Sequence, residues 1–408
     1  MIFNLTDEQR YFYDYQKTAP NSTMYNHFPM LIKLKEWVDI EKLIKSLLKT
    51  LEAHPAYLTV IEERNGVPVQ RYIPDIINNI PVEKISEAEL MTLKDDLIQP
   101  FYFGQVMCRF KIFITEKAKY LFFDDHHIVC DGFGKVIFLH DIQKVYDGQE
   151  ISCDSWFDYL REHEAVKSSK HYNESKIWYE NRYGNVDFCG YPNTDFSVGG
   201  NRLGRLYLSS GINENDLEIL RKYHLMRTEF FTAISLIATA KYNNNSAVLH
   251  TWCYKGRYKK EHNNITGMML GDMPVFLNLK NISLNEIFSS VREQVKGCLA
   301  HKDYPYTLID KKMLEDDKLC VIYQGNIYTE GPDINIFDGL IDMRNKYAGL
   351  GNVLDVEVIE SQTGIELSFD YAAHKYKKES IEKYSEIFIK SLHDILKSMK
   401  EDRCNNVF

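Results

Sequence analysis

The sequence predicts a mixed α/β protein with two lobes. Helix-type and strand-type hydrophobic patterns alternate along the chain, which is typical of layered α/β folds. A stretch rich in Gly, Pro and Asn, at 190–204, interrupts these patterns near the middle. The length of 408 residues is enough for more than one core. We therefore expect an N-terminal lobe at 1–170 and a C-terminal lobe at 171–408.

The N-terminal lobe begins with a short helix that Thr6 opens. Apolar residues at 38, 40, 43, 44, 47, 48 and 51 have helical spacing, and Asn65-Gly66 between two strand-like runs is a strong hairpin signal. The other elements that we predict in this lobe are a strand within 27–37, a helix within 86–99, two strands within 105–129 and a helix at 133–146.

The C-terminal lobe repeats the mixture of helices and strands after a polar helical stretch at 155–184. The stretch at 228–244 is apolar nearly all round, so we expect a buried helix there. The remaining predictions are helices at 213–226, 283–302 and 378–399, and strands within 246–256, 318–328 and 353–371.

Composition excludes several classes of protein. Lys+Arg 49 against Asp+Glu 58 gives a net charge of −9, so a nucleic-acid scaffold is not expected. The N-terminus lacks a signal-peptide pattern, and no apolar run is long enough for a transmembrane helix. The eight cysteines form no CxxC pair. We therefore expect a cytoplasmic protein with reduced thiols and no membrane or nucleic-acid partner.

The sharpest local feature is the sequence HHIVCDG at 126–132. An apolar strand leads into His126 and His127, and Asp131 and Gly132 precede a helix. Because side chains alternate along a strand, one histidine can face the core while the other faces a cleft. Asp131 is placed to orient the turn by an ion pair or a local hydrogen bond, and Gly132 permits a tight turn.

The motif has two other interpretations, a structural role in the core and a metal site. A histidine on a strand is more often a hydrogen-bonded core residue than a catalyst. Two histidines and an aspartate also suit a metal, but neighbouring histidines on opposite faces make a shared ion awkward, so we predict no metal site.

The motif resembles the HHxxxDG pattern of condensation domains of nonribosomal peptide synthetases and of related acyltransferases with the chloramphenicol-acetyltransferase-like fold. Further segments resemble the same family in the same order over about 390 residues. They are LTDEQRYFYDYQ with Tyr25 and Asn26, LEAHPAYLT, SWFDYLREHEA, TGMMLGDMPVFLNL, AHKDYPYTLID and the tail from Leu354 to Phe388.

This resemblance implies a specific fold and activity. The family fold is a V-shaped pseudo-dimer of two lobes with a tunnel between them. The implied reaction is amide bond formation between a carrier-bound acyl or aminoacyl thioester and an amine, with carrier proteins docking on the donor and acceptor sides. The phosphopantetheine arm of the carrier tethers the substrate, no bound cofactor is required, and a monomer is expected.

The resemblance also assigns roles to the motif residues. It implies that His127 faces the tunnel, as a base or a positioning group, and that His126 and Asp131 hold the motif in shape. A neutral imidazole suits removal of a proton from an attacking amine near neutral pH. The Gly132 N–H is a candidate donor to the thioester oxygen.

Several positions depart from the family pattern. Leu58 and Phe276 replace arginines, and Gly271 replaces an asparagine. An arginine usually pairs with the motif aspartate, and a buried unpaired charge is costly, so we expect a substitute partner for Asp131. Arg257 and Lys135 are two donors between which the sequence does not choose.

Aromatic residues elsewhere are weaker candidates. Trp252, Tyr254 and Tyr323 are candidates for lining the substrate tunnel, although core packing also accounts for each. His301, in the HKDYPY segment, is expected to be structural.

Three other functions stay open. One is an O- or N-acyltransferase of the same fold that uses a coenzyme A or carrier thioester, although the DFGWG segment of the plant-type members is missing. Another is a condensation-like domain without activity that recruits a partner, and a third is an epimerisation variant. No adenylation or carrier motif follows in the sequence, so we expect carriers to be supplied in trans or the chain to be part of a larger synthetase.

Overall fold

Contacts within the chain define two units, and neither is a single continuous segment. In the computed structural model, unit 1 comprises Met1–Ala165, Lys255–Leu270 and Glu330–Ala348, and unit 2 comprises the remaining segments, Val166–Tyr254, Gly271–Thr329 and Gly349–Phe408. The structure describes residues 1–18, 27–197, 203–309, 318–325, 334–341, 343 and 353–404.

The first boundary lies close to the predicted one, at 165/166 instead of 170/171. The predicted contiguous C-terminal lobe differs from unit 2, because two of its segments, Lys255–Leu270 and Glu330–Ala348, are grouped with unit 1. The prediction that both lobes mix helices and strands is confirmed. The expected YN pair, Tyr25 and Asn26, lies outside the described residues.

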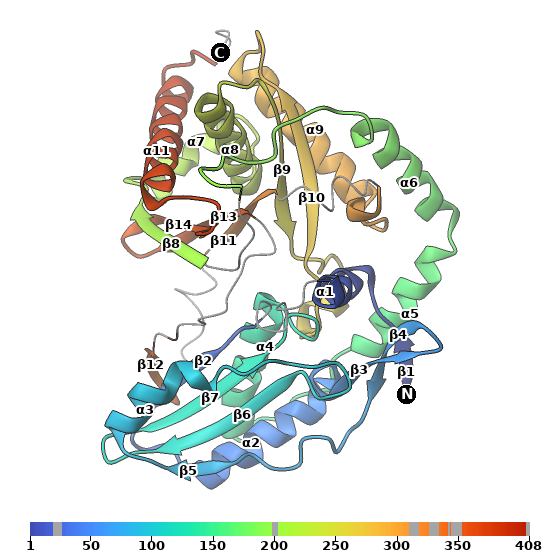
Figure 1. Ribbon diagram of the computed structural model, residues 1–408, viewed down its shortest axis with the longest axis vertical. Helices are drawn as coiled ribbons and strands as arrows, with labels where there is room; N and C mark the ends of the chain where they lie inside the picture. The colour runs from blue at the N-terminus through green and yellow to red at the C-terminus, as the bar shows by residue number, and fades with distance from the viewer. Residues whose placement is uncertain are drawn as a thin grey trace. The chain divides into compact units, whose positions relative to one another are not determined.

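Unit 1 contains a mixed sheet with the order β12-β2-β7-β6-β5 among the described residues (Figure 1). Its pairs are antiparallel except for β5 with β6, which are parallel. The strands are β2 (Met30–Leu34), β5 (Val82–Lys84), β6 (Cys108–Ile114), β7 (Lys119–Asp125) and β12 (Phe337–Ile341).

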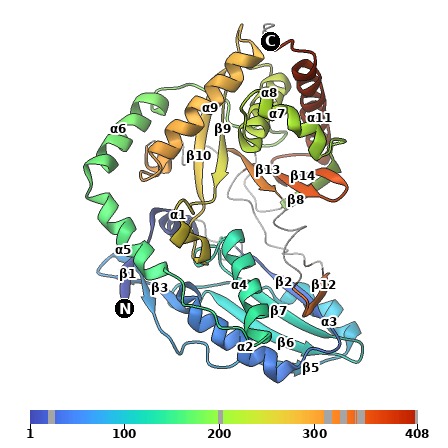
Figure 2. The same ribbon diagram turned by 180° about the vertical axis from the view of Figure 1, so that it is seen from behind.

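Helices cover both faces of this sheet. The helices of unit 1 are α1 (Asp7–Thr18), α2 (Ile40–Ala53), α3 (Glu87–Leu93), α4 (Gly132–Tyr146) and α5 (Trp156–Lys167), with short 3₁₀ turns at Pro55–Leu58, Lys94–Leu97 and Lys260–Asn264. Figure 2 shows α2 and α4 side by side on one face. Phe123 of β7 packs toward these helices, whereas its neighbour Phe122 packs with Leu90 of α3, as strand alternation requires.

A small sheet completes unit 1. It has the order β1-β4-β3, with β1 at Ile2–Asn4, β3 at Thr59–Arg64 and β4 at Val67–Tyr72. The hairpin predicted at Asn65-Gly66 is confirmed. Both residues have positive φ, 51° and 77°, which is the backbone of a type I′ turn.

Unit 2 has a six-stranded sheet with the order β10-β9-β11-β13-β14-β8 among the described residues. β9, β11 and β13 run parallel, and the outer pairs are antiparallel. The strands are β8 (Leu203–Ser209), β9 (Ala247–Tyr254), β10 (Gly271–Asn278), β11 (Leu319–Gly325), β13 (Leu354–Ser361) and β14 (Gly364–Ala372).

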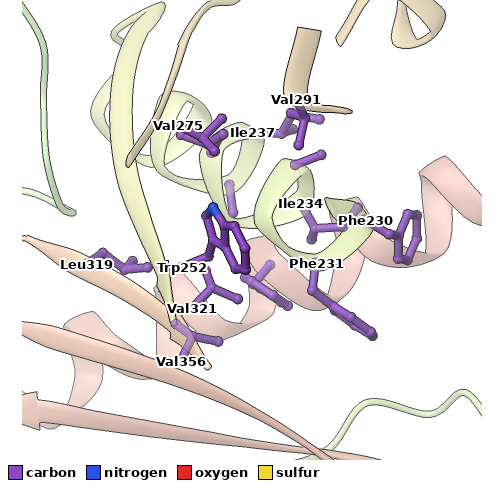
Figure 3. Close-up of a cluster of buried hydrophobic side chains, with 14 of the residues drawn as sticks. Phe230, Phe231, Ile234, Ile237, Trp252, Val275, Val291, Leu319, Val321 and Val356 are labelled. Atoms are coloured by element: carbon purple, nitrogen blue, oxygen red, sulfur yellow. The ribbon is translucent and has the colours of Figure 1, made fainter. Parts of the chain in front are cut away.

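The helices of unit 2 contribute its core. Among the described residues they are α6 (Lys170–Tyr183), α7 (Ile219–Lys222), α8 (Arg227–Asn243), α9 (Leu284–Ala300) and α11 (Lys378–Lys400), with 3₁₀ turns at Glu214–Glu218 and Tyr306–Leu308. Helix α8 is buried over most of its length, as its apolar sequence predicts. Figure 3 shows its residues Phe231 and Ile234 beside Val321 and Val356 of the sheet.

Candidate functional site

The motif histidines follow the end of β7 and lie in a turn that His126 itself stabilises. The His126 N–H donates to the Met107 carbonyl (2.8 Å), and the imidazole Nδ1 accepts from the Ile128 N–H (3.0 Å). The side chain is fully buried, and its pKa is lowered well below the usual value, first by burial and then by the neighbouring histidines His27 and His127. His126 therefore acts as a neutral, structural member of the turn.

Asp131 connects the turn to the helix that follows. Its side chain is the N-cap of α4, where Oδ1 accepts from the Gly134 N–H (2.8 Å). The other oxygen, Oδ2, accepts from Arg257 Nη1 and from the Met269 N–H, both at 2.9 Å. The carboxylate is fully buried and has three hydrogen bonds, which offset the cost of burying its charge.

Arg257 is the substitute partner of Asp131 that the sequence predicts but does not identify. It lies in the segment Lys255–Leu270 of unit 1, and its Nη2 also donates to the Ile265 carbonyl (2.8 Å). Lys135, the other donor considered, instead pairs with Asp125 (2.5 Å) and with the Phe28 carbonyl.

Two glycines allow this segment to approach α4. A Cβ at Gly134 would lie 2.0 Å from the Thr266 carbonyl oxygen, so only glycine fits there. Gly256 has φ 71° and would meet the Met269 carbonyl oxygen at 1.9 Å. Gly132, in contrast, occupies the first position of α4, and its φ is not in the left-handed region.

His127 lies among aromatic rings. Its imidazole stacks on Phe12 of α1, with centroids 5.0 Å apart and an interplanar angle of 8°. Phe28 meets the same ring edge to face at 4.5 Å and 63°. Burial lowers the pKa of His127 to about 4, against the opposing effect of the Asp131 carboxylate. The imidazole is therefore neutral at pH 7 and able to accept a proton.

A second buried group of charges lies beneath the turn. Nδ1 of His27 lies 3.0 Å from Oδ2 of Asp124, and Nη1 of Arg109 lies 3.9 Å from the same oxygen. Burial raises the pKa of Asp125 to about 6, although Lys135 opposes the shift. The sequence did not single out His27, Asp124 or Asp125, because their proximity arises only when β2 pairs with β7.

The predicted tunnel residues lie in unit 2. Trp252 is 6% exposed and packs in the hydrophobic core, as Figure 3 shows. Tyr254 is partly buried and meets Trp252 edge to face at 6.1 Å. Tyr323 is partly buried too, and its hydroxyl bonds to Glu360 and accepts from Arg227 (3.2 Å). A role of these three residues in lining a tunnel stays a prediction.

The departures from the family pattern have simple structural settings. Leu58 is buried in the core of unit 1, and Phe276 packs against the core of unit 2. His301 follows α9, where it stacks on Trp178 at 4.7 Å and hydrogen-bonds to Ser175 (3.0 Å). These contacts suit the structural role predicted for His301.

The part of the chain that the structure describes holds neither a metal-binding cluster nor a membrane-spanning helix. No group of three or more His, Cys, Asp or Glu side chains there is arranged to hold a metal ion. Among the same residues, no helix has the length and the apolar content that crossing a membrane requires.

Comparison with known proteins agrees with this geometry. The family model described as "Condensation domain" matches residues 2–405. Tyrocidine synthase 3 of Brevibacillus parabrevis is 23% identical over 419 aligned residues, which cover 97% of this chain and 6% of that protein. The chain thus spans only a small part of this relative.

Solved structures share the fold. The first condensation domain of the calcium-dependent antibiotic synthetase, in complex with a substrate analogue, aligns with a TM-score of 0.78 at 16% identity and covers 100% of this chain and 99% of that one. The X-domain in its complex with OxyB from teicoplanin biosynthesis aligns with a TM-score of 0.80 at 15% identity, covering 100% and 96%. The resemblance expected from HHIVCDG and the other segments is confirmed.

Proposed function

The chain belongs to the condensation-domain family, and from this premise we propose that it forms an amide bond between a carrier-bound thioester and an amine. The donor is an acyl or aminoacyl group on the phosphopantetheine arm of a carrier protein. The acceptor is an amine, presented on a second carrier or free. The observation that carries the proposal is the neutral imidazole of His127 in an intact HHIVCDG turn.

The proposed reaction exchanges a C–S bond for a C–N bond. The amine attacks the thioester carbonyl, and His127 accepts a proton from the nitrogen as positive charge develops there. When the tetrahedral intermediate collapses, the thiolate leaves and takes up this proton. The products are an amide and the free thiol of the carrier arm, so atoms and charges balance without an acyl-enzyme.

The surroundings of His127 keep its ring free of a proton before the amine attacks. Its ring is neutral over the physiological pH range because burial disfavours the imidazolium. Asp131 lies near enough to favour the protonated form when a proton arrives, while hydrogen bonds from Gly134, Arg257 and Met269 hold its carboxylate in place. A general base of this kind contributes about 10²- to 10⁴-fold to a rate.

The first turn of α4 is the proposed site for the carbonyl oxygen. N–H groups at a helix N-terminus have no partners within the helix and suit developing negative charge. Gly132 occupies the first position of α4, and its lack of a side chain leaves its backbone accessible to a reacting group. We therefore assign the Gly132 N–H as a candidate donor to the oxyanion.

Intact-mass analysis of product on the carrier tests this function. Wild-type protein is incubated with a thioester-loaded carrier and an amine acceptor, beside His127→Ala and the matched control His140→Ala. His140 is a partly buried histidine on α4 outside the motif. We expect product from the wild type and from His140→Ala, and about 10²- to 10⁴-fold less from His127→Ala.

Other outcomes would overturn the proposal. Equal rates for His127→Ala and the wild type would remove His127 from the chemistry. Amide formation that fails with every donor, while coenzyme A thioesters or alcohols react, would favour the O- or N-acyltransferase alternative. Complete inactivity together with stable binding of a partner protein would favour recruitment.

A further inference from the structure

Helix α1 carries two side chains that contact the HHIVCDG turn. Gln9 and Phe12 are three residues apart, so they lie on one face of the helix. Gln9 reaches the backbone of the turn at Ile128, and Phe12 reaches the ring of His127. The turn is therefore supported from a segment more than 100 residues away in the sequence.

Gln9 is fully buried and has a partner on each side of its amide. Its Nε2 donates to the Ile128 carbonyl (2.9 Å), and its Oε1 accepts from the amide of Gln70 (2.7 Å) and from the Thr6 N–H (3.1 Å). Because a buried amide without partners is costly, this network holds α1 and the turn in one register. Ile128 directly follows His127, so the network fixes the backbone next to the imidazole.

Phe12 packs flat against the His127 ring. The two rings are nearly parallel, and Phe28 closes a second side edge to face. Nδ1 of His127 has no hydrogen-bond partner among the described residues, so the ring contacts add to the backbone interactions at His127 and Cys130 in orienting the imidazole. Aromatic contacts of this kind contribute about 0.5–1.5 kcal/mol beyond burial.

We propose that Gln9 and Phe12 are positioning residues that set the place and the plane of the His127 imidazole. Gln9 acts through the Ile128 carbonyl, and Phe12 acts through ring stacking. The link to catalysis rests on the proposed amide-forming function, whereas the placement of the ring does not. Misplacing a reacting group by about 1 Å costs on the order of 10²-fold in rate, so modest loosening has a measurable effect.

Solution NMR of the histidine ring signals tests the role of Phe12 without any substrate. Phe12→Leu removes the stacked ring, Phe12→Tyr retains it, and Tyr15→Leu is the matched control on the same helix. Because a stacked ring shifts the protons above it upfield, we expect the His127 ring signals to move downfield in Phe12→Leu alone. Unchanged His127 signals in a folded Phe12→Leu protein would overturn the role of Phe12.

The backbone signals of the turn test Gln9. Gln9→Met removes the donor to the Ile128 carbonyl, and Gln16→Met is the control, because Gln16 donates to the Phe101 carbonyl instead. We expect the amide signals of 127–129 to shift in Gln9→Met and to stay in place in Gln16→Met. Identical shifts in both variants, or none, would contradict the proposal.

Kinetics then separate this inference from the proposed function. For amide formation, we expect Phe12→Leu to lower kcat about 10-fold with little change in KM, and Phe12→Tyr to restore it. An NMR shift in a protein whose wild type makes no amide would retain the positioning role and refute the proposed reaction. If the wild type forms the amide but the His127 ring signals do not move in Phe12→Leu, the proposed reaction stands and the positioning role is refuted.

Discussion

Two histidines of unit 1 lie beside α4 in opposite surroundings. His54 is 1% exposed, and each of its ring nitrogens is 3.0 Å from a carboxylate, Asp154 at Nδ1 and Asp141 at Nε2. His127 contacts two aromatic rings instead. Although burial opposes the charge of His54, its two carboxylates raise its pKa, whereas burial lowers the pKa of His127 to about 4.

This difference separates a structural histidine from a chemically available one. The charged His54 ring joins Asp141 of α4 to Asp154, which also accepts from the N–H and the hydroxyl of Thr266 (both 3.2 Å). It thereby supports the segment that carries Arg257. The neutral His127 ring joins no charged groups in this way, which leaves it available for the proton transfer proposed above.

The largest expected effect on stability comes from His54→Leu. Removing the imidazolium leaves the buried carboxylates of Asp141 and Asp154 facing an apolar side chain, and breaking a buried ion pair costs about 3–5 kcal/mol. His127→Leu loses two aromatic contacts but breaks no buried ion pair, so we expect a smaller loss, about 1–3 kcal/mol. Urea denaturation measures the free energy of unfolding of both variants. Equal losses would contradict the distinction between the two histidines.

The next largest effect comes from Arg257→Lys. Lysine keeps the charge but cannot donate at once to Asp131 and to the carbonyls that Arg257 bonds. We expect a loss of about 1–3 kcal/mol in the free energy of unfolding. Arg161→Lys, on the exposed face of α5, is the control. If Arg257→Lys unfolds at the same urea concentration as the wild type, the hydrogen bonds of Arg257 to Asp131 and to the carbonyls do not stabilise the fold.

The smallest effect is on the pH dependence of stability, where the two histidines act with opposite sign. The raised pKa of His54 gives a stabilisation that is complete below the unfolded pKa of about 6.5 and is lost as pH rises through the folded value. The lowered pKa of His127 gives a loss of stability as pH falls from about 6.5 toward about 4.

Unfolding free energies of the wild type and both variants across this pH range test the signs. His54→Leu reduces the decline on the alkaline side, and His127→Leu reduces the decline on the acid side, to which the buried His126 also contributes. Subtracting the curve of each variant from that of the wild type reports on one histidine. Asp125, with a pKa of about 6, titrates in the same range in all three proteins. A His127→Leu curve that runs parallel to the wild type below pH 6.5 contradicts the lowered pKa.

The sequence predicted the local parts of this site and missed the parts made by long-range packing. The Asn65-Gly66 hairpin and the helix after the HHIVCDG turn follow from local patterns and are confirmed. The choice of Arg257 as the partner of Asp131 depends on how Lys255–Leu270 returns to unit 1, which no local pattern encodes. The contact of Phe12 with His127 is non-local in the same way.

Some elements also differ from their sequence patterns. The helix predicted at 213–226 is a 3₁₀ turn followed by the short α7, and it ends before His224, which has a φ of 53°. The pattern of apolar residues there is too short to sustain a longer helix against this left-handed residue. β12 was not predicted, because it joins the sheet only by pairing with β2, some 300 residues earlier.

An NMR titration that follows the ring protons of assigned histidines decides whether the HHIVCDG turn holds His127 neutral while His54 stays charged. We expect a His127 midpoint near 4 and a His54 midpoint above the usual 6.5. A His127 midpoint at or above that of His54 would contradict this expectation.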